Sequence, residues 1–225
     1  MKRGTKTNRV RLRYDRILKC VFVIVIIGLV IYHFLNVRLT NIYIQGNHYL
    51  SDQSIIEISS LQNYPKMIKI NKNAIIANLT KQNEIIEANV IKKYSTIIIE
   101  VKEAKPLYYD LSSKQIILTN GKTTNKSYNL PILVNYIPNT IIEEFHSLLA
   151  TIDEEVFVRI SEIKYAPNID TERFLLTMND GNYVYINLNR FDLLDNYLTI
   201  ISNFKGKKGI IYLDSGSHFK LFEKS

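Results

Sequence analysis

Apolar residues follow distinct patterns in different parts of the chain. One uncharged apolar run extends from Cys20 to about Val37. Because a helix rises about 1.5 Å per residue, roughly 18 to 20 such residues cross a bilayer core of about 30 Å. After this run, short stretches that alternate apolar and polar positions are mixed with stretches of helical period. The pattern therefore predicts one membrane-spanning helix at residues 20–37, followed by a folded region of strands and helices.

The charges beside the apolar run predict its orientation. Residues 1–19 contain eight Lys or Arg and one Asp, whereas Arg38 is the basic residue close to the other end. Basic flanks stay on the cytoplasmic side. We therefore expect a single-pass type II membrane protein with a cytoplasmic N-terminus and an extracytoplasmic C-terminal region. The alternative is a cleaved signal peptide, but its apolar region would be shorter and would end in small residues, unlike Tyr32-His33-Phe34-Leu35.

Residues 39–103 predict a module of order β-α-α-β-β. Stretches that alternate as half-buried strands do are Leu39–Gln45, Ile85–Tyr94 and Thr96–Glu103. Ser51 and Asn71 each precede a stretch of helical period, and both are candidate N-caps. Met67–Ile70 is expected to be a short extended link between the two helices.

Pro106 marks a boundary, since a proline cannot donate to a strand ladder. Beyond it the pattern predicts a mixed sheet with two helices. The expected strands are residues 107–111, 115–119, 160–165, 173–178, 183–188, 209–214 and 217–222. The helices are expected at Ile141–Ile152 and after Asn189, which would cap the second one. Leu130-Pro131-Ile132-Leu133 is interpreted as an apolar knot that plugs the core.

These elements indicate an α+β fold class with a single-pass anchor. The expected division is a basic cytoplasmic tail at residues 1–19, a transmembrane helix at 20–37, a first domain at 38–105 and a second domain at 106–225.

Charge argues against a nucleic-acid partner. The net charge is +8, but residues 20–225 carry 21 Lys or Arg against 20 Asp or Glu. The excess positive charge therefore lies in the N-terminal tail and indicates the orientation of the chain in the membrane. We expect no basic stripe on the external part. Cys20 is the only cysteine, so the exported part has no disulfide, which favours a bacterial source.

No constellation of catalytic, cofactor-binding or metal-binding residues stands out. The four histidines are scattered without H-E-x-x-H spacing, and there is no cysteine cluster. Gly121-Lys122-Thr123 lacks the upstream glycine of a phosphate loop. Ser161-Glu162-Ile163-Lys164 has S-x-x-K spacing, but in a strand its serine and lysine point to opposite faces. We expect no enzyme, no cofactor, no metal and no small-molecule substrate. Protein binding is the remaining role.

The order of these features resembles the FtsQ/DivIB family of bacterial cell-division proteins. Residues 39–47 resemble the opening strand and Gly-Asn turn of the family's POTRA domain, and residues 130–133 resemble its Leu-Pro-hydrophobic block. Pro106 sits at the family's domain junction. Further similar blocks are residues 66–71, 89–103, 179–181, 194–197 and 208–214. Two positions depart, since the family often has a proline at Ser95 and an aspartate near Tyr212.

The resemblance implies a POTRA domain at 38–105, a β domain at 106–225, and a non-enzymatic scaffold of the division complex at the septum. It also implies bitopic partners of the FtsB/DivIC and FtsL types, bound at the C-terminal edge strand of the β domain. An exposed edge strand carries unpaired backbone groups that an incoming strand can satisfy. The candidate partner-binding residues within Gly209–Phe222 are Ile210, Tyr212, Asp214, Phe219, Lys220 and Phe222. The POTRA module offers a second pairing edge.

Three other classes of protein compete with this interpretation. An outer-membrane assembly factor with POTRA modules would need a β-barrel of several hundred residues. An anchored enzyme of wall metabolism would need a nucleophile or a metal cluster. A membrane-anchored extracytoplasmic assembly or scaffold protein outside cell division remains the main alternative.

Overall fold

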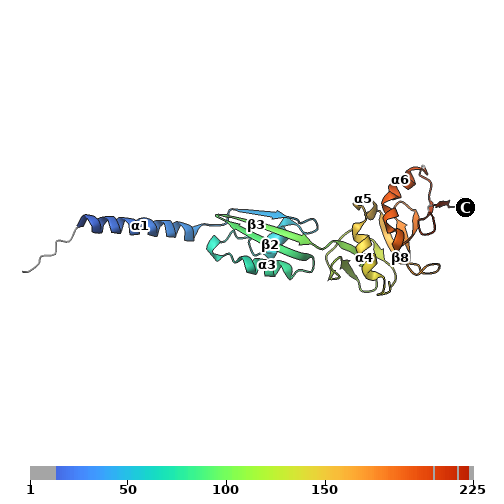
Figure 1. Cartoon of the computed structure of the whole chain (residues 1–225), viewed down its shortest axis with the longest axis horizontal. Helices are drawn as coiled ribbons and strands as arrows, with labels where there is room; N and C mark the ends of the chain where they lie inside the picture. Colours follow the sequence, from blue (N-terminus) through green and yellow to red (C-terminus); the bar gives the residue numbers. More distant parts are fainter. Residues whose placement is uncertain (1–13, 205, 217, 223–225) are drawn as a thin grey trace, which may run out of the picture.

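The computed structural model describes residues 14–204, 206–216 and 218–222. Figure 1 shows these residues as an elongated molecule in which a long helix leads into a small sheet module, and a larger sheet module follows. The C-terminal strands lie in the larger module, at the end away from the helix. The α+β class and the order of the modules agree with the sequence prediction.

The N-terminal helix α1 comprises Tyr14–Asn36 and is long and apolar enough to cross a membrane. It begins six residues before Cys20, because Tyr14–Lys19 contains no Pro or Gly and continues the helix beyond the apolar run. Its apolar side chains, such as those of Phe22 and Ile24, are exposed. A helix that is apolar on all sides requires an apolar environment, which fits the predicted anchor.

The first module contains a three-stranded sheet of order β1-β3-β2. Its elements are β1 (Asn41–Gln45), α2 (Asp52–Ile58), the 3-10 helix η1 (Met67–Lys69), α3 (Lys72–Thr80), β2 (Ile85–Lys93) and β3 (Thr96–Glu103). Strand β1 is parallel to β3, and β2 is antiparallel to it. The central strand turns Ile97, Ile99 and Val101 into the core, where they join Ile55 of α2 and Leu79 of α3. The alternation in the sequence predicted this buried face.

Both predicted helix caps of the first module are confirmed. The Ser51 side chain accepts a hydrogen bond from the Ser54 N–H at 3.2 Å, and the Asn71 side chain accepts one from the Asn73 N–H at 3.0 Å. The predicted extended link was wrong, because residues 67–69 form η1. A three-residue turn places Met67 and Ile70 on the same, buried side and leaves Ile68 exposed.

The second module is built on one sheet of order β12-β11-β10-β9-β8-β7-β4-β5-β6. Its strands are β4 (Pro106–Asp110), β5 (Gln115–Leu118), β6 (Thr123–Thr124), β7 (Ile132–Leu133), β8 (Ile160–Tyr165), β9 (Arg173–Met178), β10 (Tyr183–Asn187), β11 (Gly209–Tyr212) and β12 (His218–Leu221). Its helices are α4 (Ile142–Thr151), α5 (Glu154–Phe157), η2 (Leu188–Asn196) and α6 (Tyr197–Ser202). The core centres on Phe145 of α4, which stacks on Phe174 of β9 at 4.5 Å between ring centroids.

Two interpretations of the second module need correction. The apolar block at residues 130–133 is not a knot, because Ile132–Leu133 forms β7, which is parallel to both β4 and β8. Asn189 does not cap a helix, since it lies inside η2, and Arg190 has φ −131° there. Helix α6 then starts only at Tyr197. The short helix α5 adds to the two expected helices, and Asp153 caps it by accepting from the Glu155 N–H at 2.8 Å.

The two modules meet at a buried carboxylate. Glu84, which precedes β2, accepts a hydrogen bond from the Thr124 hydroxyl of β6 at 2.6 Å and pairs with the Lys126 ammonium at 3.2 Å. Burial acts to raise the pKa of Glu84, but these donors outweigh it and hold the pKa below its usual value. Beside this contact, the Asn83 side chain donates to the Thr123 carbonyl at 2.8 Å. The first module therefore covers part of the sheet edge at β6.

The hydrogen bonds of β11 alternate between its two neighbours. The Leu213 N–H donates to the Tyr185 carbonyl of β10 at 2.8 Å, and the Phe222 N–H donates to the Lys208 carbonyl at 3.1 Å. With the register Ile210↔Lys220, the alternation of an antiparallel pair directs the backbone groups of residues 218, 220 and 222 toward β11. The backbone groups of residues 219 and 221 therefore point away from the sheet.

Glycine is required at the start of β11. A Cβ at Gly209 would lie 2.2 Å from the Lys220 carbonyl oxygen and 2.8 Å from Cζ of Phe219. Both atoms belong to β12, so the absence of a side chain allows β12 to lie against β11.

Replacing Glu84 with Gln should weaken the junction between the modules. We expect a loss of about 1–3 kcal/mol in the free energy of unfolding at pH 7, because a buried charged hydrogen bond is removed. Because the pKa of Glu84 is lower in the folded state, its contribution to the free energy of unfolding is fully present above the ordinary glutamate pKa of about 4.3. The contribution is lost as the pH falls through the folded-state value. Denaturant unfolding of the full chain in micelles at several pH values checks this. Glu87→Gln, at an exposed position of β2, is the control, and equal losses for both variants would contradict the prediction.

Replacing Gly209 with Ala should displace β12. We expect a cost of about 1–3 kcal/mol, as for other overpacked sites, concentrated in the β11–β12 pair. Hydrogen exchange should therefore accelerate at the amides of Lys220 and Phe222 and stay unchanged in β8 and β9. Lys207→Ala, at an exposed position two residues earlier, is the control. Unchanged protection of Lys220 in the Gly209 variant would show that β12 does not depend on this close approach.

Candidate partner-binding edge

Strand β12 is the terminal strand of the large sheet on one side. Among the residues that the structure describes, it pairs with β11 alone, so one edge of β12 has no strand against it. The N–H and C=O groups of Phe219 and Leu221 face this edge. At the other end of the sheet, β6 is contacted by Asn83 and Glu84. In the described chain the large sheet thus has its unpaired edge at β12.

The six predicted site residues do not form one surface. Ile210 and Tyr212 of β11 lie on one face of the sheet together with Lys220, and Phe222 extends this face by packing against the Tyr183 ring at 5.9 Å. Phe219 is opposite Ile211 and points to the other face, where its ring stacks on that of Phe204. Asp214 lies beyond the end of β11. Four of the six residues therefore share a face, and Phe219 lies behind them.

Stacked side chains cross the sheet on the first of these faces. The Tyr185 ring of β10 stacks on the Tyr212 ring of β11 at 5.4 Å, and Tyr212 stacks on the His218 ring of β12 at 4.5 Å. The guanidinium of Arg173 lies 3.7 Å from the centroid of the Tyr185 ring. Cross-strand pairs of this kind stabilise neighbouring strands. Tyr212 therefore stabilises the position of β12 against β11, and part of its side chain remains exposed to solvent.

The carboxylate of Asp214 is used inside the domain. The Arg173 Nε donates to Asp214 Oδ2 at 2.6 Å, and both side chains are only 6% exposed. This ion pair fixes the chain directly after β11. Arg173 was not identified in the sequence analysis. The available signal was a charged residue at the first position of an otherwise apolar strand, which indicates that the charge is paired with a buried partner.

Phe219 forms one wall of a small apolar groove. Its ring stacks on the Phe204 ring at 3.9 Å between centroids. The groove has a volume of about 200 Å³, and its lining includes Ile200 of α6 and Ile211 of β11. It lies next to the free edge of β12. A groove of this size and character could accept one apolar side chain of an added strand.

A buried polar network positions the start of β11. The Gly209 N–H donates to the Asn182 side-chain oxygen at 3.0 Å, while the Asn182 amide and the Tyr197 hydroxyl donate to Asp180 at 3.0 and 2.7 Å. Burial acts to raise the pKa of Asp180, but these donors outweigh it and lower the pKa. Burial also raises the pKa of Tyr197. The sequence predicted the Asn179-Asp180-Gly181 turn but not the role of Asn182.

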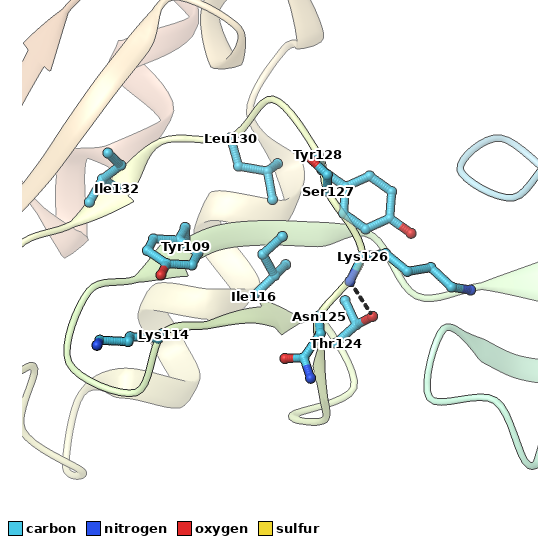
Figure 2. A pocket seen from close by; sticks show the side chains of 10 residues that line it. All are labelled: Tyr109, Lys114, Ile116, Thr124, Asn125, Lys126, Ser127, Tyr128, Leu130 and Ile132. Atoms are coloured by element: carbon cyan, nitrogen blue, oxygen red, sulfur yellow. Dashed lines mark hydrogen bonds between the residues drawn. The ribbon is translucent and has the colours of Figure 1, made fainter.

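Another hollow of the second module lies near β6 and has a volume of about 480 Å³. In Figure 2, Ile116 and Leu130 point toward each other across it, and Lys114 and Lys126 lie at opposite ends. The dashed line marks the bond from the Lys126 N–H to the Thr124 hydroxyl at 3.2 Å. No carboxylate, imidazole or thiol is among its lining residues in the described chain. Its titratable side chains are those of Tyr109, Lys114, Lys126 and Tyr128.

Comparison with known proteins assigns the family. The FtsQ-type POTRA domain family matches residues 37–104. The cell division protein DivIB of Geobacillus kaustophilus is 31% identical over 191 residues, which cover 80% of this chain and 73% of that protein. DivIB of Erysipelothrix rhusiopathiae is 30% identical over 213 residues, with 88% and 79% covered.

A solved structure of the major extracytoplasmic domain of DivIB from Geobacillus stearothermophilus, in its trans isomer, is 26% identical. It covers 46% of this chain and 96% of that domain, with a TM-score of 0.38. The assignment rests on the sequence relatives, which match along most of their own length. This chain belongs to the DivIB family of bacterial cell-division proteins.

Proposed function

We propose that this protein is a non-enzymatic scaffold of the division complex that binds a partner by strand addition at β12. The observation that carries the proposal is the free edge of β12, where the backbone groups of Phe219 and Leu221 have no strand against them in the described chain. An added strand satisfies such groups by main-chain hydrogen bonds. The proposed partners are bitopic division proteins of the FtsB/DivIC type and, in the same complex, of the FtsL type.

The side chains around β12 support a specific fit. The groove beside Phe219 would take an apolar side chain from the added strand. On the opposite face, Ile210, Tyr212 and Phe222 supply apolar contact, and Lys220 supplies a charge at the rim. Because alternate residues of a strand point to opposite faces, one added strand would use both surfaces at once. In this proposal Asp214 acts by holding Arg173 and is not a contact residue.

The proposed location follows from α1 and the basic tail. We propose that residues 1–19 are cytoplasmic, that residues 20–37 cross the membrane, and that the POTRA domain (38–105) and the β domain (106–225) are extracytoplasmic at the division septum. A partner anchored in the same membrane can add a strand only if β12 lies on the same side of the membrane as the partner's extracytoplasmic region. Membership in the DivIB family favours this role over that of a scaffold outside cell division.

Substitution of Leu221 by Pro should abolish partner capture and leave the fold intact. The Leu221 N–H points to the free edge, so a proline ring there removes a donor that only the added strand uses. We expect capture of a DivIC-like extracytoplasmic region by the full chain in nanodiscs to fall at least about tenfold, which corresponds to about 1.4 kcal/mol. Hydrogen-exchange protection of Lys220 should stay unchanged.

Two matched variants distinguish the backbone from the side chain. Leu221→Ala keeps the outward N–H and should retain capture within about threefold. Lys220→Pro removes the N–H that faces β11 and should release β12 itself, with loss of its exchange protection. Undiminished capture by the Leu221→Pro variant would rule out pairing at this edge.

The proposed orientation can be measured by cysteine labelling. In a Cys20→Ser background, Lys122→Cys places a thiol at an exposed position of the β domain, and Lys6→Cys places one in the tail. A membrane-impermeant maleimide added to intact protoplasts should label position 122 and leave position 6 unlabelled until the cells are lysed. The reverse pattern would overturn the orientation.

A further inference from the structure

Basic residues gather where the first module meets α1. They are Arg38, Lys66, Lys69, Lys72, Lys92 and Lys93. They come from residues 36–41, 59–72 and 91–97, which contain no Asp or Glu. The remaining part of residues 38–225 carries 15 Lys or Arg against 20 Asp or Glu. The balanced total therefore conceals a separation of charge, which counting over the whole external part does not reveal.

Backbone contacts bring the three segments together. The Met67 N–H donates to the Val37 carbonyl at 2.8 Å, and the Thr40 N–H donates to the Ser95 carbonyl at 2.8 Å. The Lys66 ammonium donates to the Asn36 side chain at 2.7 Å, at the end of α1. The cluster is thus fixed directly beside the last turn of the helix.

Four of these six cations have no partner among the residues that the structure describes. Lys66 is tied to Asn36, and the Lys92 ammonium donates to the Met67 and Ile70 carbonyls. The other side chains are exposed, and within the described residues they make no hydrogen bond or ion pair: Arg38, Lys69, Lys72 and Lys93. Like charges held together without acidic neighbours repel one another unless an external anion is bound. The charge of the cluster is therefore complementary to an anion outside the chain.

The same region contains a groove with an apolar floor. Its volume is about 490 Å³, and it lies between the end of α1 and the first module. Phe34 and Leu35 of α1 line it together with Ile68 of η1, and the rim holds Lys72, Lys93 and Tyr94. The Ile68 and Tyr94 side chains are 59% and 58% exposed. Both therefore present apolar surface that a bound apolar group would cover. A bond of 2.6 Å between the His33 ring and the Tyr94 hydroxyl holds the two sides of the groove together.

We propose that this groove binds an anionic phospholipid of the outer leaflet. The last turn of a spanning helix lies at the level of the lipid headgroups. There the cations of the rim meet the lipid phosphate, and the apolar floor meets the upper part of an acyl chain. A soluble polyanion would neutralise the cations but would leave Phe34 and Ile68 in water. The inference rests on α1 crossing the membrane, and not on strand addition at β12.

Hydrogen exchange in lipid nanodiscs tests the proposal on the full chain. Exchange of the amides in residues 66–72 and 91–95 is compared in nanodiscs of phosphatidylcholine alone and with phosphatidylglycerol added. Each exposed lysine near an anionic surface strengthens association by about fivefold. We therefore expect exchange in these two segments to slow by at least about threefold with phosphatidylglycerol. Exchange in β8 and β9 should not change, because screening confines the attraction to about 10 Å.

Charge and floor variants separate the two parts of the site. The triple variant Lys69→Glu, Lys72→Glu and Lys93→Glu should lose the protection by phosphatidylglycerol. Its control carries the same change of charge at exposed positions away from the helix, Lys102→Glu, Lys122→Glu and Lys164→Glu, and should keep the protection. Ile68→Ser should lose at least half of the protection, whereas Ile169→Ser, at a residue that is 79% exposed in the second module, should lose none.

Two outcomes would overturn the proposal. The first is equal exchange in the two kinds of nanodisc. The second is equal protection by soluble poly(glycerol phosphate) added to phosphatidylcholine nanodiscs, which would assign the cluster to a polymer outside the membrane. Neither outcome bears on partner capture at β12, so the two proposals fail separately.

Discussion

The register of β11 is the constraint on which the edge of the large sheet depends. It is set at one end by the bond from the Gly209 N–H to Asn182 and at the other by the bond from the Leu213 N–H to Tyr185. A slip of one residue would turn Ile211 out of the core and place Tyr212 in it. The same slip would separate Asp214 from Arg173 and leave a charge buried without a partner, which is strongly destabilising. The outward groups of β12 follow from this register, because β12 pairs with the residues of β11 that do not face β10.

The two terminal strands of the large sheet have different neighbours for a physical reason. An unpaired edge is a liability, and proteins protect it with short strands, charges or covering elements. Strand β6 has only two residues and is covered by Asn83 and Glu84 of the first module. Strand β12 is four residues long, and Lys220 supplies one charge. The first module thus covers the β6 edge, and within the described residues the large sheet keeps a lightly protected edge at β12.

Local signals in the sequence predicted a large part of the fold. The bounds of β3, β8 and β9 and the caps at Ser51 and Asn71 were correct, because alternation and capping depend on neighbouring residues. Features set by distant pairing were missed. Arg173 and Asp214 lie 41 positions apart, and Tyr212 and Phe219 separate onto opposite faces only once the β11–β12 register is known.

The charge cluster was missed for a related reason. Its cations come from three separate segments, and their positive charge is cancelled by acidic residues elsewhere when the net charge of the external part is counted. The helix η1 and the β7 strand are too short for a periodic pattern to reveal them.

The two junctions of this elongated molecule are held by different kinds of contact. Between the modules, a buried carboxylate accepts two donors, and its loss would leave polar groups of β6 unsatisfied. Between α1 and the first module, the Met67 N–H donates to the Val37 carbonyl at 2.8 Å and the Lys66 ammonium donates to the Asn36 side chain at 2.7 Å. The bond of His33 to Tyr94 beside them is exposed, and exposed polar contacts contribute little to stability. The junction between the modules therefore depends on a buried charge, whereas the junction beside α1 depends on backbone and surface polar bonds.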